Sequence, residues 1–324
     1  MAEYSWPAIG HEKIIDFLER ALVNNKVAQT YIFVGSGDLG KSTIALAFAR
    51  NLQGASENFN SDLHILEPIE DKKSISIDQV RDFIKILSLS SFSNSYKIGV
   101  IKWAELLSSE AKSALLKTLE EPQDKVIVIL LVDKEESLPE TILSRAQVLY
   151  FNPVPASVIY DYLIKTYNTN RSLAKDLANL AIGRPLMAIK YLENSELYRR
   201  YWERAETWLK IISSDLTARW SLLDSLFNDK TWSKQAVESA LDTLALAEGL
   251  ARDLLLLTLG QRDRLQHSAI RPQLEEAQKW LAETHDSDAT PAILREFQLI
   301  AQAKEYLAAN VNPRLVLEQI IINL

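Results

Sequence analysis

One segment near the N-terminus limits the fold of this 324-residue chain more than any other. An apolar run at residues 31–34 leads directly into a glycine-rich turn, and the turn leads into a helical pattern at residues 44–49. Strand, glycine-rich turn and helix in this order are typical of a phosphate-binding loop, because glycines let backbone N–H groups point inward at phosphate oxygens. The predicted nucleotide-binding residues are Gly35, Ser36, Gly37, Asp38, Leu39, Gly40, Lys41, Ser42 and Thr43.

Two side chains of this loop have expected roles toward ATP or ADP. Lys41 would lie near the β- and γ-phosphates, and the Ser42 hydroxyl would face Mg²⁺. A coincidental Gly/Ser turn is the alternative interpretation. The strand and helix patterns on either side favour the phosphate loop.

The rest of the pattern predicts an α/β core followed by helices. Short runs rich in Ile and Val alternate with helical patterns, which indicates a parallel sheet covered on both faces. The predicted strands are residues 31–34, 64–66, 98–101, 126–132 and, as a candidate fifth, 147–151. Two prolines stiffen residues 152–155, and only helical periodicity follows. We therefore predict an α/β domain over 1–153, a small helical domain over 154–194 and a helical bundle over 195–324.

Composition excludes several classes of protein. The chain has no cysteine, so disulfides, thiolate metal sites and thiol nucleophiles are all excluded. A formal net charge of -7 argues against a protein that binds nucleic acid unaided, because neutralising phosphates needs a basic face. No apolar run reaches the roughly 18 residues of a membrane-spanning helix, and no basic region followed by an apolar one opens the sequence. We expect a cytoplasmic protein without membrane contact.

The second core strand ends without the carboxylate that a phosphate-loop hydrolase needs to hold Mg²⁺ and direct water. The residues after positions 98–101 are Lys102 and Trp103. Lys102 would repel a metal ion, and the indole of Trp103 can only donate a hydrogen bond. Glu105 could replace the missing acid only if the register shifted, and we expect it beyond the strand. The sequence therefore predicts a degenerate site with no metal-holding carboxylate.

Arg145 follows a short predicted helix. Residues 137–140 predict a capped helix start, and the next turns would carry Arg145 to the edge of the domain. From these residues alone, the favoured interpretation is a surface arginine in a local ion pair.

Several dispersed segments resemble the AAA+ subunits of bacterial DNA polymerase III clamp loaders. They are SALLKTLEEP at 113–122, LPETILSRA at 138–146, ISIDQVR at 75–81, IGH at 9–11 and NPRLVLE at 312–318. The resemblance extends over nearly the whole chain. It implies an AAA+ nucleotide-binding core over the α/β domain, a helical lid over 154–194 and an all-α collar or oligomerisation domain over 195–324.

The resemblance also implies roles for single residues. Motor subunits of the family carry an Asp-Glu pair after the second core strand, whereas delta-prime subunits often have degraded ATP sites, as Lys102 and Trp103 indicate here. The family's polar sensor falls at Val132 or Asp133, and its lid arginine falls at Leu186. Ser144 and Arg145 match the Ser-Arg-Cys motif, with Ala146 in place of cysteine. Arg145 is thus implied to act in trans, as an arginine finger on the ATP of a neighbouring subunit.

By resemblance, the partners are gamma/tau motor subunits, a delta subunit, the sliding clamp and primer–template DNA within the complex. We expect neither ATPase nor polymerase activity from the chain alone, although it would be a component of a DNA-directed DNA polymerase holoenzyme. The four-cysteine zinc module of many relatives is absent, because only residues 52–61 bridge its place, so no zinc is expected. An active motor ATPase of the same family and a phosphate-loop phosphotransferase are the alternatives, together with a structural subunit whose loop binds nothing.

Overall fold

The computed structural model describes residues 4–54, 62–69, 74–89, 96–121, 123–227, 232–285 and 288–324. Most of the expected zinc-module position, 52–61, and Pro122 of the resembling segment lie outside these residues. The chain divides into two compact units, one made of Met1–Asn168 and Ile182–Met187 and the other of Thr169–Ala181 and Ala188–Leu324. Residues of the predicted lid belong to both units, and the three predicted domain ranges stay a prediction.

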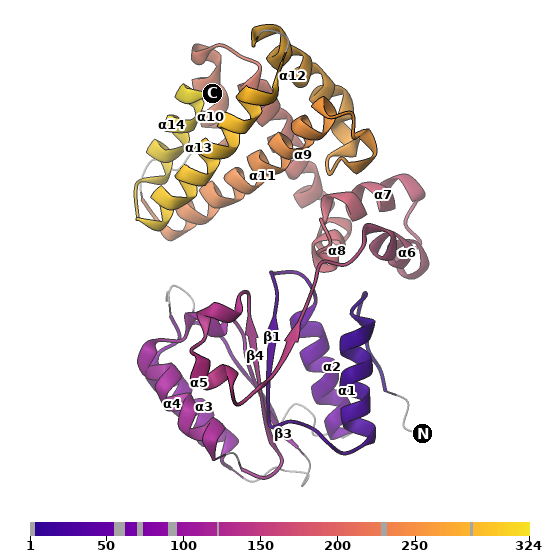
Figure 1. Cartoon of the computed structure of the whole chain (residues 1–324), viewed down its shortest axis with the longest axis vertical. Coiled ribbons are helices and arrows are strands. Elements are labelled where there is room, and N and C mark those ends of the chain that lie inside the picture. Colours follow the sequence, from indigo (N-terminus) through magenta and orange to yellow (C-terminus); the bar gives the residue numbers. More distant parts are fainter. Residues whose placement is uncertain are drawn as a thin grey trace. The chain divides into compact units, whose positions relative to one another are not determined.

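The first unit is built on a parallel sheet of five strands in the order β2-β3-β4-β1-β5 (Figure 1). Its strands are β1 (Thr30–Val34), β2 (Leu63–Leu66), β3 (Lys97–Ile101), β4 (Val126–Val132) and β5 (Gln147–Tyr150). The predicted α/β class and all the predicted strand positions, including the fifth, are confirmed. Because the strands are parallel, the segments that follow β1, β3 and β4 meet at one edge of the sheet, where ligands bind in such folds.

Both faces of this sheet are covered by helices, as Figure 1 shows. These helices are α1 (Glu12–Val23), α2 (Lys41–Gln53), α3 (Ile77–Leu87), α4 (Ser109–Glu120) and α5 (Glu140–Leu143). Helix α6 (Ala156–Tyr167) follows the last strand along the chain and does not cover the sheet. Side chains of a strand alternate between faces. In β4 the odd-numbered residues 127–131 pack with α1 and α2, and the even-numbered residues 126–132 pack with α3, α4 and α5. All seven residues of β4 are buried, which explains its continuous apolar run.

The helices of this unit begin at local signals in the sequence. Ser76 caps α3, and its hydroxyl accepts from the Gln79 backbone N–H while the Gln79 side chain accepts from the Ser76 N–H. Ser108 caps α4 in a similar way, with Oγ 3.1 Å from the Ala111 nitrogen. These caps satisfy N–H groups that the first turn of a helix leaves unpaired.

The second unit is helical throughout its described residues. Its helices are α7 (Arg171–Leu180), α9 (Ser195–Ile212), α10 (Leu216–Leu226), α11 (Lys234–Thr258), α12 (Arg271–Thr284), α13 (Thr290–Ala308) and α14 (Pro313–Asn323), together with most of α8 (Pro185–Glu193). A single apolar core joins α9 to α14, and its members include Trp208, Leu244, Leu250 and Leu317. The predicted helical bundle is confirmed. In the described part of the chain, no helix combines the length and the apolar character needed to cross a membrane.

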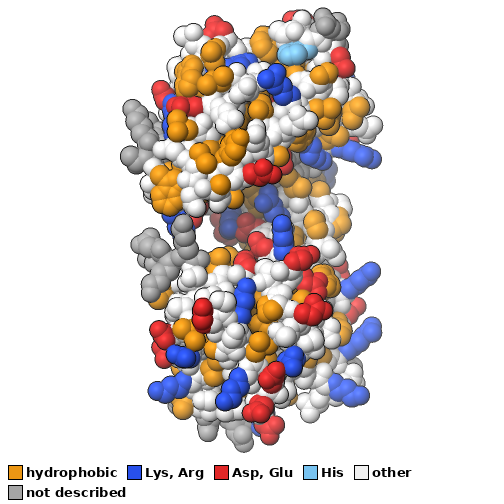
Figure 2. Space-filling model, turned by 60° about the vertical axis from the view of Figure 1, so that its left-hand side comes forward, with side chains coloured by type: hydrophobic (Ala, Val, Ile, Leu, Met, Phe, Trp, Pro, Cys, Tyr) orange, Lys and Arg blue, Asp and Glu red, His pale blue; other side chains and the backbone are white. Residues whose placement is uncertain are grey.

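Charged side chains of both signs are interspersed on the molecular face drawn in Figure 2, over both units. Lysines and arginines on this face are separated by aspartates, glutamates and apolar side chains, so the face carries no continuous basic stripe. That distribution agrees with the formal net charge of -7.

Candidate nucleotide site and exposed arginine

The glycine-rich segment forms a loop between β1 and α2, as the sequence predicts. Gly35 has a φ of +154°, and a Cβ placed on it would lie 2.5 Å from the Phe151 carbonyl oxygen, so only glycine fits. Gly40 has a φ of +97° at the start of α2, where a left-handed residue is most easily supplied by glycine. Leu39 is buried and its carbonyl oxygen lies 2.9 Å from the His11 ring, whose pKa burial lowers. The packing of Leu39 and its contact with His11 therefore hold the loop in place.

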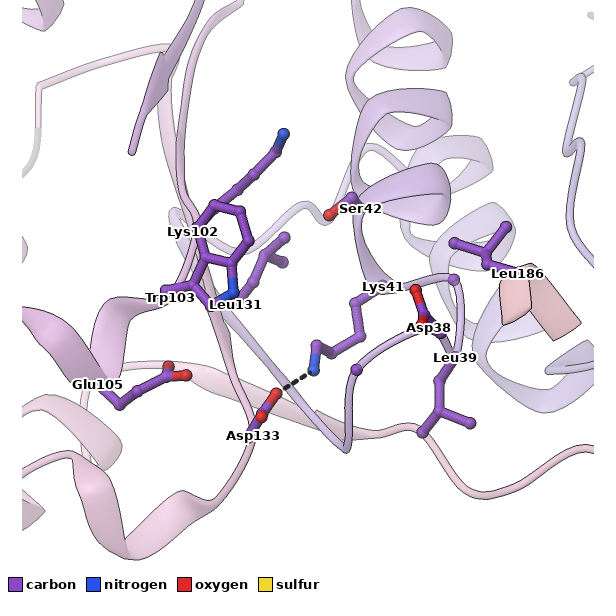
Figure 3. A pocket seen from close by; sticks show the side chains of 12 residues that line it. Asp38, Leu39, Lys41, Ser42, Lys102, Trp103, Glu105, Leu131, Asp133 and Leu186 are labelled. Carbon is purple, nitrogen blue, oxygen red and sulfur yellow. Dashed lines mark hydrogen bonds and ion pairs between the residues drawn. The ribbon is translucent and has the colours of Figure 1, made fainter. Parts of the chain in front are cut away.

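This loop forms one wall of a cavity of about 240 Å³ (Figure 3). Its lining residues come from the loop, from the segment after β3, from β4 and its end, and from the start of α8: Gly37, Asp38, Leu39, Gly40, Lys41, Ser42, Lys102, Trp103, Glu105, Leu131, Asp133 and Leu186. The first turn of α2 has no acidic residue, which suits a helix N-terminus that faces an anion. The Leu186 backbone N–H donates to the Asp38 carbonyl at 3.1 Å, so the start of α8 is tied to the loop.

Inside the cavity, the ammonium group of Lys41 has three oxygen acceptors. It donates to the carbonyl oxygens of Gly35 and of Ser36, the latter at 3.1 Å, and it pairs with Asp133 Oδ1 at 2.9 Å. The Lys41 side chain is only 10% exposed, whereas that of Asp133 is 54% exposed. An ammonium group has three N–H donors, so the hydrogen-bonding capacity of Lys41 is used within the chain.

The segment after β3 places a paired cation and an indole at the cavity. Lys102 points away from the phosphate loop in Figure 3, and its Nζ pairs with Glu67 Oε1 at 2.5 Å. Trp103 lies in the left-handed region, with φ 51° and ψ 49°, and is 49% exposed. A bulky residue costs about 1–2 kcal/mol in this conformation, so the surroundings must hold the turn. The two residues directly after β3 are therefore Lys102 and Trp103, and neither is a carboxylate.

The turn at Trp103 is held by backbone contacts on its far side. It leads into the short 3-10 helix η2 (Ala104–Leu106), which precedes α4. The Ile75 N–H donates to the Leu106 carbonyl at 2.7 Å, and the Ser108 N–H donates to the Ile75 carbonyl at 3.0 Å. This clamp fixes the direction in which Glu105, the middle residue of η2, points.

Glu105 lies beyond the strand, as expected, yet its side chain lines the same cavity. Its Oε2 is buried and has no hydrogen-bond partner among the described residues. Burial raises the pKa of the Glu105 carboxyl most, and the nearby Asp133 charge raises it further, while Lys41 and backbone N–H groups lower it. Figure 3 shows the Glu105 carboxylate directed toward Asp133 and the end of Lys41. Two carboxylates thus stand near the phosphate-loop lysine, although neither follows β3 directly.

The helix before Arg145 does not begin as the sequence predicts. α5 starts after Pro139 without a side-chain cap, and the Ser137 hydroxyl instead donates to the Lys134 carbonyl at 2.6 Å. The expectation of a capped start at 137–140 was wrong because Ser137 belongs to a separate 3-10 turn, η3 (Glu135–Ser137).

Arg145 nevertheless lies at the surface just after α5. Its guanidinium donates to the Thr141 carbonyl at 2.9 Å and pairs with Glu120 Oε1 at 3.0 Å. The side chains of Arg145 and Glu120 are 38% and 50% exposed. The local ion pair favoured from the residues alone is therefore present. Arg145 is absent from the lining of the cavity that holds Lys41.

Comparison with known proteins shows which family the chain resembles. A family model described as "DNA polymerase III, delta subunit" matches residues 10–155. The DNA polymerase III subunit delta' of Bacillus subtilis is 25% identical over 96% of this chain and 95% of its own length. The subunit delta' of Haemophilus influenzae is 30% identical over 59% of this chain and 58% of its own length. The chain is similar to DNA polymerase III delta' subunits. The suspected resemblance is thereby confirmed.

A solved structure supports the fold assigned to this chain. A DNA polymerase III gamma subunit-related protein from Thermotoga maritima matches with a TM-score of 0.50 and 18% identity, over 94% of this chain and 97% of that one. The AAA+ class of the α/β core and the helical C-terminal region are confirmed at the level of fold.

The fold brings the predicted loop residues 37–42, Lys102 and Trp103 around one cavity. This cradle fits a phosphate group, since a Cβ on Gly37 or Gly40 would meet nothing within 4 Å and the helix start carries no acid. Residues 35–43 would hold the nucleotide, and Ser42 is the candidate Mg²⁺ ligand. Among the described residues, no group of three or more His, Asp or Glu is placed to bind a metal ion by itself. These assignments, and that of Arg145, stay predictions.

Three carboxylates near this site were not predicted in their observed roles. Asp133 was treated only as a sensor position, Glu105 was placed correctly beyond the strand but not at the cavity, and Glu67 was not considered. The only available signal was that Asp133 follows the predicted strand 126–132, at the same sheet edge as the phosphate loop.

Proposed function

We propose that this chain is the delta-prime subunit of a clamp loader, and that it contributes to ATP turnover in a neighbouring subunit without hydrolysing ATP itself. On this proposal it forms a cytoplasmic ring with gamma/tau motor subunits and a delta subunit, and the ring loads the sliding clamp on primer–template DNA. Similarity to DNA polymerase III delta' subunits supports the assembly. The helical bundle α9–α14 supplies the surface through which such a ring would assemble.

The end of β3 supports the absence of intrinsic hydrolysis. In phosphate-loop hydrolases, carboxylates at this edge hold the metal ion and direct the attacking water. Here Lys102 and Trp103 follow the strand, and Glu67 is occupied by its ion pair with Lys102 at 2.5 Å. ATP or ADP would be held through Lys41 and Ser42, and the chemistry would belong to the neighbour.

The exposed guanidinium of Arg145 is the observation that carries the proposal. Its ion pair with Glu120 joins two exposed side chains, and such pairs contribute only about 0–1 kcal/mol. Moving Arg145 from this pair to a phosphate of an adjacent subunit would therefore cost little. A planar guanidinium suits phosphate oxygens and can stabilise the charge of phosphoryl transfer.

The decisive experiment measures ATP turnover in a reconstituted loader. All motor subunits except the one next to this chain would carry inactivated phosphate loops, so that a single interface is assayed. Arg145→Ala should reduce turnover on the order of 10³-fold, as loss of an arginine finger does elsewhere. Arg81→Ala is the matched control, because Arg81 is also a surface arginine in an exposed pair with an acid, Asp78. Equal turnover in the two variants would refute the finger assignment.

Glu105 favours a second candidate function, that of an active motor ATPase. Its side chain lines the cavity together with Asp133, so acids are present despite the unsuitable end of β3. The isolated chain should then show sustained Mg²⁺-dependent ATP hydrolysis that Glu105→Gln abolishes. That result would defeat the proposal of a non-hydrolysing subunit, whereas no turnover above the Lys41→Ala variant would support it.

A further inference from the structure

The ammonium group of Lys41 is hydrogen-bonded to three oxygens of the chain, and this affects which nucleotide the site can bind. We propose that the phosphate-loop cavity selects a nucleoside diphosphate over a triphosphate, because Asp133 takes the lysine that a third phosphate would need. Asp133 would thus act as a built-in competitor of the γ-phosphate. The inference rests on the proposed nucleotide site but not on the role of Arg145.

The first step concerns the lysine. In phosphate loops this residue contacts the β- and γ-phosphates. Here the three donors of Lys41 already meet the Gly35 and Ser36 carbonyls and Asp133 Oδ1, the last at 2.9 Å. A β-phosphate can also be bound by backbone N–H groups of the loop. A γ-phosphate depends more on Lys41, so a triphosphate must displace Asp133 or stand beside its charge.

The second step concerns the other charges of the cavity. Glu105 lies on the same side as Asp133, and its buried Oε2 meets no hydrogen-bond partner in the part of the chain that the structure describes. The second lining lysine, Lys102, does not offset these acids, because its ammonium pairs with Glu67. An additional phosphate charge would therefore enter next to two carboxylates and one shared ammonium. Like charges in a partly desolvated site repel more strongly than they do in water.

The third step concerns the lid side of the cavity. Leu186 lies at the start of α8 and lines the cavity with an apolar side chain. Its backbone N–H is used by the Asp38 carbonyl at 3.1 Å. This part of the wall therefore offers an incoming third phosphate no cationic side chain. A site of this kind would stay in one nucleotide state while neighbouring motor sites exchange ADP for ATP.

Calorimetric titration of the full chain with ADP and with ATP, each with Mg²⁺, tests the proposal. The wild-type chain should bind ADP at least about tenfold more tightly than ATP, which corresponds to about 1.4 kcal/mol. Asp133→Asn keeps the shape of the side chain and removes its charge. This variant should bind ATP about tenfold more tightly than wild type and ADP with little change.

Matched variants make the outcomes decisive. Asp124→Asn removes the same charge at an exposed position outside the cavity and should leave the ratio of ADP to ATP affinity unchanged. Unchanged melting of Asp133→Asn would show that its fold is intact. Equal or tighter ATP binding by the wild-type chain would overturn the proposal, because it would mean that the carboxylates hold Mg²⁺ for the triphosphate. Failure to bind either nucleotide would overturn it as well, while the Arg145 turnover assay would still test the proposed function separately.

Discussion

The strongest quantitative prediction concerns a buried acid in the helical bundle. Glu296 on α13 is 2% exposed, and its Oε1 accepts a hydrogen bond from Trp208 Nε1 on α9 at 3.0 Å. Apolar side chains of α9, α11 and α14 form the surrounding core. Burial raises the pKa of Glu296 to about 7, and the Trp208 hydrogen bond offsets only part of that effect. We predict that Glu296→Gln stabilises the bundle, and that it does so increasingly with pH.

The sign follows from proton binding. The carboxyl has a pKa of 4.5 when unperturbed and about 7 in the folded chain, so the folded state binds the proton more tightly. The stability associated with this proton is complete below about pH 4.5 and is lost as the pH rises through about 7. A difference of about 2.5 pKa units, at 1.36 kcal/mol each, amounts to about 3 kcal/mol at pH 8.5 and less than about 1 kcal/mol at pH 5.

Guanidinium unfolding followed by tryptophan fluorescence measures this effect, since Trp208 contacts the substituted side chain. The diagnostic quantity is the difference in unfolding free energy between variant and wild type at about pH 5 and about pH 8.5. Any constant cost of the extra amide donor cancels in that comparison. Glu305→Gln, at an exposed position on the same helix, should show no such pH dependence. A difference that is the same at both pH values would refute the reasoning.

Two further predictions concern stability and use the same unfolding assay. A methyl group on Gly99 would lie 2.5 Å from the Phe83 side chain, so Gly99→Ala should destabilise the first unit by about 1–3 kcal/mol. A methyl group on Gly37 would meet nothing within 4 Å, so Gly37→Ala should change the stability by no more than about 0.5 kcal/mol. Arg314 pairs with Asp224 at 2.6 Å and thereby joins α14 to α10, so Arg314→Ala should cost about 2 kcal/mol and Arg314→Lys should recover only part of it. Unchanged midpoints in either substitution would contradict these contacts.

The sheet and the phosphate loop could be predicted from the sequence because their signals are local. All seven residues of β4 are buried, and burial on both faces leaves an unbroken apolar run. Gly35 and Gly40 stand where the backbone needs glycine, so their spacing identifies the loop. Such features depend on a few neighbouring residues, and they survive without knowledge of tertiary contacts.

The composition of the cavity could not be predicted, because it depends on two non-local features. The pair between Lys41 and Asp133 joins residues 92 positions apart and exists because β1 lies beside β4. Apolar runs identify strands but do not give their order in the sheet. Glu105 lines the cavity two residues after Trp103, which adopts a left-handed conformation that nothing in an indole side chain demands. The long-range clamp through Ile75 supplies the constraint instead.

Lys41 and Arg145, the two cationic side chains with proposed roles, differ in how firmly the chain holds them. This difference bears on which phosphate each could bind. Lys41 is 10% exposed and has three oxygen partners, so withdrawing its ammonium would break three hydrogen bonds at once. Arg145 is 38% exposed, and its partner Glu120 is half-exposed, so water can replace either one. A phosphate arriving from outside therefore meets less resistance at Arg145 than a third phosphate meets at Lys41. On our proposals, the chain therefore acts on the nucleotide of its neighbour through Arg145 and does not hydrolyse a nucleotide of its own.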